Sequence, residues 1–178
     1  MGDLLFNPQG RILKRRFWQG LIILTVAGII LRAMQVHLAP MFGLMGAFVF
    51  ALPALVLVYV QICIYSKRFH DAGLTGWLII AVWIGALMVI WIMQSLLGGI
   101  FLGEEELAIQ AEVFERMMQG ESEIALEGMQ LVAEKTLPLN IIMVCTNAVI
   151  MGLIVGSLKT QPGQNKHGPV PGEEWQDF

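Results

Sequence analysis

Three long stretches of the sequence carry no charged side chain, and each is long enough to cross a membrane as a helix. They comprise residues 41–65, 74–103 and 136–158. The hydrocarbon core of a bilayer is about 30 Å thick, and about 20 apolar residues in a helix span it. Within that core every backbone polar group needs an internal partner, which a helix supplies. The uncharged runs therefore predict an all-α, polytopic membrane protein.

A fourth span precedes these runs and contains a single charge. Residues 17–37 are mostly apolar and carry one formal charge, Arg32, which lies within about two helical turns of Pro40 and can extend its guanidinium to the interface. Pro40 is expected to end this helix and begin a tight turn. A cleaved signal peptide is the alternative interpretation, but His37-Leu38-Ala39 is a poor cleavage site. Only 14% of the residues are charged, which is too few to coat the surface of a soluble enzyme, and a length of 178 residues leaves no room for a separate soluble catalytic domain.

The predicted architecture is a four-helix transmembrane bundle with a short helical insertion in the outer loop between spans 3 and 4. A basic N-terminus (1–16) precedes the membrane domain (17–158), and a Pro/Gly-rich tail (159–178) follows it. The spans are placed at about 17–37, 41–65, 74–102 and 136–158, with the insertion at 104–135.

The distribution of Lys and Arg predicts the orientation. The side that holds both termini carries Arg11, Lys14, Arg15, Arg16, Lys67, Arg68, Lys159 and Lys166, whereas the other side carries Arg32, Arg116 and Lys135. Loops rich in Lys and Arg stay in the cytoplasm, so both termini are expected there.

The insertion shows two helical patterns separated by Gly120. Leu107, Ala111, Phe114 and Met118 recur at helical spacing in the first, and glutamates occupy the other faces. We expect a helical hairpin over the outer end of the bundle. A docking surface for a periplasmic partner and a cation site at Glu104–Glu106 are the alternatives. Thr136 and Pro138 are expected to open the fourth span as an N-cap and an early helical proline.

Three motifs gather on the predicted cytoplasmic side. They read GRILKRRFW from Gly10, KRFHDAGLTGW from Lys67 and PGQNKHGPVP from Pro162. Together they resemble the small bacterial inner-membrane proteins of the domain of unknown function 805 family. The middle motif comprises Lys67, Arg68, His70, Asp71, Gly73, Gly76 and Trp77 and is the most specific. Its last five residues named here are in register with the family pattern, whereas Lys67 replaces an arginine and Thr75 a serine. The resemblance implies a bacterial inner membrane and about four spans, and it implies no reaction.

The motif residues have a structural and a binding interpretation. In the first, polar side chains of the short loop satisfy helix ends, with Thr75 capping the third helix and Trp77 anchoring at the headgroups. In the second, basic and polar residues from all three motifs form one patch that binds an anionic lipid headgroup or another phosphate. The residues of that patch are Arg11, Arg15, Arg68, His70, Asn165 and Lys166.

Catalysis is the weakest interpretation. His70, Asp71 and His167 are chemically suitable metal ligands or acid–base groups. The sequence nevertheless has no HExxH motif and no nucleophile paired with a base. We therefore expect no enzyme activity, no catalytic residues, no metal and no cofactor.

The spans themselves contain polar amides and small residues. Gly152 and Gly156 allow close helix packing, within the bundle or between two copies of the chain, and Asn147 is suited to hydrogen-bond another helix. Because no Asp, Glu or Lys lies deep in a span, a coupled pump is disfavoured.

The sequence predicts a non-catalytic membrane scaffold or interaction protein. Its expected partners are the lipid bilayer, anionic lipids and a membrane or periplasmic protein; a homo-oligomer is an open alternative, and nucleic acid is not expected. A small transporter or channel component is the alternative function, and a metal-dependent membrane enzyme ranks below it.

Overall fold

The computed structural model describes residues 5–43, 45–120 and 122–171. The named elements in this part are all helical, which confirms the all-α prediction. They are α2 (Lys14–Leu38), η1 (Ala39–Phe42), α3 (Met45–Asp71), η2 (Gly76–Leu78), α4 (Ile79–Phe101), α5 (Glu104–Gln119) and α6 (Ser122–Gly156). The final residues of the predicted tail, 172–178, lie outside the described part.

Four helices are long and apolar enough to cross a membrane, as predicted. These stretches are Lys14–Phe42, Phe48–Asp71, Gly76–Phe101 and Glu127–Gly156. In α4 only 17% of the most apolar window is buried inside the protein. A soluble protein does not expose apolar surface on this scale, so the bilayer is the solvent for these faces.

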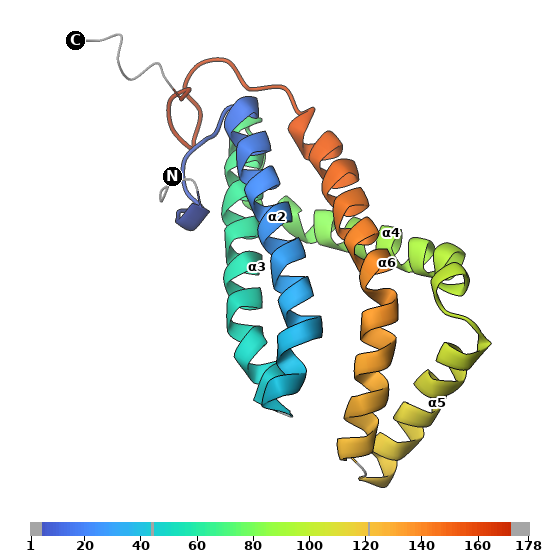
Figure 1. The fold of residues 1–178 in the computed structure, drawn as a ribbon. Helices are drawn as coiled ribbons and strands as arrows, with labels where there is room; N and C mark the ends of the chain where they lie inside the picture. The colour runs from blue at the N-terminus through green and yellow to red at the C-terminus, as the bar shows by residue number, and fades with distance from the viewer. Residues whose placement is uncertain (1–4, 44, 121, 172–178) are drawn as a thin grey trace.

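The helices form an open bundle in which α2 is central (Figure 1). α2 and α3 lie antiparallel, α6 packs beside α2, and α4 crosses α6. We call the end of the bundle that carries residues 10–13, 66–78 and 157–170 the terminal face. The opposite end, where α5 folds back on α6, is the insertion face (Figure 1).

Pro40 ends the first span as expected. α2 stops at Leu38, and Pro40 occupies the first turn of η1, where its missing N–H leaves no helical bond unmade. Gly43 then adopts a positive φ of 54° in the turn toward α3. Near the terminal face the two helices share an aromatic core, in which Phe17 and Tyr65 stack edge to face with ring centroids 5.5 Å apart.

The expected break between the insertion and the fourth span is wrong. α6 is one continuous helix from Ser122 to Gly156, with Pro138 in its interior. Thr136 is not an N-cap, because its hydroxyl donates back to the carbonyl of Val132 at 2.8 Å. Pro138 removes the bond to the carbonyl of Glu134, an exposed position where water can take its place.

The face of α5 that packs against α6 is also different from the predicted one. The sequence pattern indicated Leu107, Ala111, Phe114 and Met118. Ile109 and Val113 pack toward Gly128 of α6, where the absence of a side chain leaves room for them. Phe114 and Met118 are 69% and 76% exposed. The side chains of Glu105 and Glu106, part of the cation site considered above, lie outside what the structure describes.

Candidate functional site

Asp71 is the centre of a polar cluster on the terminal face. Its side chain is completely buried. One carboxylate oxygen accepts from Nε of Arg11 at 3.3 Å, and the other accepts from the Arg68 guanidinium and from the Thr160 hydroxyl, the latter at 2.7 Å. A buried carboxylate is tolerated only when it is paired and hydrogen-bonded, and these donors meet both conditions. We call Arg11, Arg68, Asp71, Thr160 and Gln161 the terminal clasp.

Arg11 holds the N-terminal segment to the tail. Its terminal nitrogens donate to the carbonyls of Gly163 at 2.7 Å and Gln161 at 2.5 Å. The backbone N–H of Gln161 in turn donates to the carbonyl of Asp71 at 2.8 Å. The flat guanidinium fork suits this role, because it can serve several acceptors at once.

Arg68 closes the C-terminal end of α6. Its guanidinium donates to the carbonyls of Gly156, at 3.4 Å, and Leu158, where the last turn of α6 leaves acceptors without helical partners. A cation at this end is also favoured by the helix dipole. Nε of Arg68 is buried without a hydrogen-bond partner in the described part of the chain.

The glycine of the loop motif has a specific backbone task. At the end of α3 the N–H of Gly73 donates to the carbonyl of His70 at 3.0 Å, and the N–H of Leu74 to that of Phe69 at 2.8 Å. This pair of bonds is a Schellman motif, which needs a left-handed residue, and Gly73 has φ +76°. A β-carbon there would also collide with the side chain of Gln161 in the clasp.

The tail motif forms a tight turn that places an imidazole on the loop. Asn165 and Gly168 exchange backbone hydrogen bonds of 3.1 and 3.0 Å, and the Asn165 amide donates to the carbonyl of His70 at 2.9 Å. The ring of His167 then stacks on that of His70, with centroids 3.8 Å apart and planes 9° from parallel. Nδ1 of His70 carries the proton, because it lies 3.1 Å from the carbonyl of Gly10.

His167 is suited to be neutral in this stack. Burial, and after it the positive charge of Lys166, lower the pKa of the His167 imidazole below its usual value, although a hydrogen bond to the backbone of Leu74 raises it in part. A lowered pKa keeps this ring uncharged at neutral pH, which permits face-to-face contact with a second imidazole.

Five basic side chains surround the clasp and remain exposed. They are Lys14, Arg15, Arg16, Lys159 and Lys166, and we call them the basic rim. The structure therefore divides the predicted anion-binding patch into two groups. Arg11, Arg68, His70 and Asn165 hold the loop, tail and N-terminal segment together, whereas Arg15 and Lys166 face outward.

Sequence reasoning missed Thr160 and Gln161, and it did not recognise Asp71 as the centre. A usable signal was present, since Asp71 is the sole Asp or Glu between residues 4 and 103. One acidic residue among many basic ones is a strong candidate for a buried ion pair. Thr75 caps η2 as expected, accepting from the N–H of Trp77 at 3.4 Å.

The small residues of α6 lie against α2. β-carbons built at Gly152 and Gly156 would come within 3.1 Å of the Trp18 ring, and one at Gly152 within 2.5 Å of Leu21. The two glycines thus permit the close contact of α2 and α6. Asn147 lies about one and a half helical turns beyond Gly152, further from the terminal face. Its side chain lines a cavity and not the contact between α2 and α6.

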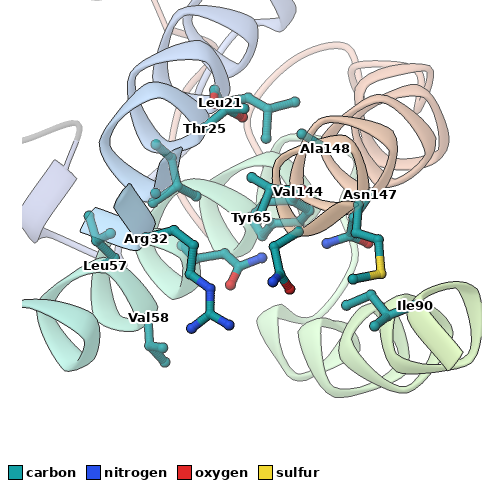
Figure 2. A pocket seen from close by; sticks show the side chains of 15 residues that line it. Leu21, Thr25, Arg32, Leu57, Val58, Tyr65, Ile90, Val144, Asn147 and Ala148 are labelled. Carbon is teal, nitrogen blue, oxygen red and sulfur yellow. Dashed lines mark hydrogen bonds between the residues drawn. The ribbon is translucent and has the colours of Figure 1, made fainter. Parts of the chain in front are cut away.

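That cavity lies between the spans and has a volume of about 300 Å³. Most of its wall is apolar, but Arg32 of α2, Gln61 of α3, and Asn140 and Asn147 of α6 contribute polar groups. Figure 2 shows Arg32 and Asn147 extending toward this space from their two helices.

Comparison with known proteins identifies one family. The family described as protein of unknown function (DUF805) matches residues 5–169, nearly the whole chain. No curated protein and no solved structure matches significantly.

Proposed function

Because the chain belongs to the DUF805 family of proteins of unknown function, we propose its role from its own geometry. We infer that it is a non-catalytic scaffold of the bacterial inner membrane, with both termini in the cytoplasm. In this proposal the terminal clasp fixes the shape of the terminal face, and the basic rim binds anionic lipid headgroups.

The observation that carries the proposal is the use of the motif side chains as internal ties. Asp71, Arg68 and Arg11 are 0%, 1% and 8% exposed, and their polar atoms bond to segments up to 157 residues apart in the chain. A catalytic acid, base or nucleophile has to reach a substrate. Groups held in this way instead support a rigid surface for other molecules.

The basic rim supplies the binding chemistry. Basic residues close to an anionic membrane surface contribute about 1 kcal/mol each to binding. Lys14, Arg15 and Arg16 open α2, and Lys159 and Lys166 lie in the tail that the clasp holds beside it. Their positions at one end of the bundle support this proposal, because the ends of a membrane bundle are expected at headgroup level.

The test is retention of phosphatidylglycerol by the full chain, measured by native mass spectrometry after extraction in mild detergent. We expect wild-type protein to retain this lipid, and the triple variant Lys14→Gln, Arg15→Gln, Arg16→Gln to lose most of it. Arg116→Gln on the insertion face removes one exposed charge far from the rim and serves as the control. Equal retention by the triple variant and the wild type would contradict the lipid-binding role.

A small transporter or channel component is the second candidate. The cavity between the spans favours it, since polar side chains contribute to its largely apolar wall and transported solutes need polar groups within the membrane. Solute flux into liposomes above that of protein-free liposomes, reduced by Asn147→Leu, is the outcome that this function requires.

A further inference from the structure

Arg32 is a cation inside a membrane span, and no acidic partner for it lies among the residues that the structure describes. It lies in α2 about 9 Å before the helix ends at Leu38. Its one hydrogen bond with the described residues goes to Oε1 of Gln35 at 3.2 Å, and none of their carboxylates forms an ion pair with it. An unpaired charge at this depth is costly, and such residues commonly mark the site of a ligand or ion.

The cavity beside Arg32 continues toward the middle of the membrane, and its wall includes an amide whose oxygen has no partner among the described residues. Oδ1 of Asn147 is buried and accepts no hydrogen bond from the described residues. The Trp18 ring of α2 lies against Gly156 of α6, so these two residues give a common level near the terminal face. Measured along the helices from that level toward the insertion face, Asn147 lies at about 14 Å, Arg32 at about 21 Å and Asn140 at about 24 Å.

Two levels of the cavity therefore offer different chemistry, about 7 Å apart along the bundle axis. At one level Arg32 offers donors and a positive charge, next to Asn140. At the other level Asn147 offers an unused acceptor. The rest of the wall is formed largely by aliphatic side chains, among them Leu24, Val58 and Ile90.

Arg32 also lines a second cavity, which leads to the insertion face. This cavity has a volume of about 360 Å³ and lies between α2, α5 and α6. Val113, Phe114 and Met117 of α5 form one wall, and Met129, Val132 and Thr136 of α6 form another. A molecule that reaches Arg32 from the insertion face would pass between apolar side chains, which suits an amphiphile better than a hydrated ion.

We propose that the cavity between the spans binds an amphiphilic organic anion, whose carboxylate or phosphate pairs with Arg32 and whose apolar body lies toward Asn147. A hydrogen-bond donor on that body, such as a hydroxyl, would satisfy Oδ1 of Asn147. The molecule enters from the insertion face, past α5. A free fatty acid and a membrane phospholipid share this chemistry. The site is distinct from the basic rim, which lies at the other end of the bundle.

The test uses decanoate as the probe and the full chain in nanodiscs of zwitterionic phosphatidylcholine. Binding of radiolabelled decanoate is measured by equilibrium dialysis, with protein-free nanodiscs subtracted. We expect saturable binding by the wild type, at least tenfold weaker binding by Arg32→Gln, and partial recovery in Arg32→Lys, which restores the charge. Arg116→Gln removes a charge on α5 from a residue that lines neither cavity, and it should bind as the wild type does.

Further probes separate the anion from its apolar chain and the two sources from each other. Decanol, which has the same chain and no charge, should compete poorly. Phosphatidylglycerol that remains bound to the extracted protein, and is displaced by decanoate, identifies a phospholipid as the source; decanoate binding with no retained lipid identifies a free acid. Equal affinity for decanol and decanoate would overturn the proposal, and so would unchanged decanoate binding in a folded Arg32→Gln variant. The proposal is also overturned if the protein neither binds decanoate saturably nor retains phospholipid.

Discussion

Asp71→Asn is the substitution that tests the terminal clasp most directly. It keeps the size and shape of the side chain and removes the negative charge between Arg11 and Arg68. Asparagine can accept through one oxygen, whereas the carboxylate accepts through two from three donors. At least one guanidinium loses its side-chain acceptor, and both remain buried without a counter-charge.

The expected loss of stability follows from these contacts. A hydrogen bond to a charged group contributes about 1.5–3 kcal/mol, and removal of one partner from a buried ion pair costs about 3–5 kcal/mol. Arg11 and Arg68 keep carbonyl acceptors at Gly163 and Leu158, which reduces the penalty. We therefore expect Asp71→Asn to lower the free energy of unfolding by about 3 kcal/mol.

The same chain offers a matched control in the exposed ion pair of Glu112 and Arg116 on α5. Their side chains are 56% and 34% exposed and are spaced i,i+4, a geometry that contributes about 0.3–0.5 kcal/mol. Unfolding of both variants by dodecyl sulfate in mild detergent, followed by tryptophan fluorescence, compares them under one condition. If Asp71→Asn lowers the free energy of unfolding no more than Glu112→Gln, the clasp does not stabilise the fold.

Three further predictions concern the tail, the loop and the packing of the spans. The native pKa values of His167 and His70 both lie below the ordinary value of 6.5, chiefly because of burial, so the unfolded state binds more protons as the pH falls. Attachment of the tail should therefore be stable above about pH 6.5 and weaken below it, as hydrogen exchange of the tail would show. A His167→Phe variant should reduce this pH dependence and leave the part that belongs to His70. Gly73→Ala forces alanine into a left-handed conformation and should cost about 1–2 kcal/mol of unfolding free energy. Gly152→Ala places a methyl group against Leu21 and should cost about 1–3 kcal/mol. Gly28→Ala, which has nothing within 4 Å, is the control for both glycine variants and should be neutral or slightly stabilising in the same unfolding assay.

The spans could be predicted from the sequence because the bilayer imposes a simple length and polarity condition. The stretches without charge matched the long apolar helices, and Pro40 marked the first turn. The condition does not locate helix ends that lie in water. α6 therefore continues to Ser122 through Thr136 and Pro138, since solvent can reach the exposed carbonyl that loses its backbone bond.

The motif residues could be found from the sequence, but their roles could not. Arg68 belongs to a basic loop motif, and basic loops on the cytoplasmic side are normally exposed. Its burial depends on contacts with Thr160 and Leu158, about 90 residues further along the chain. No local pattern encodes such a distant pairing, because the tail has no helical or strand periodicity of its own.

The sequence by itself determined the class of the protein, its spans and the residues that carry its polar chemistry. The tertiary structure decided which charges are neutralised inside and which are available to other molecules. Asp71 pairs with Arg11 and Arg68 and removes them from the surface, whereas Arg32 forms no ion pair with the part of the chain that the structure describes and lines a cavity. The physical reason is that burial of a charge depends on the position of its counter-charge, which is set by how the helices and the tail pack together.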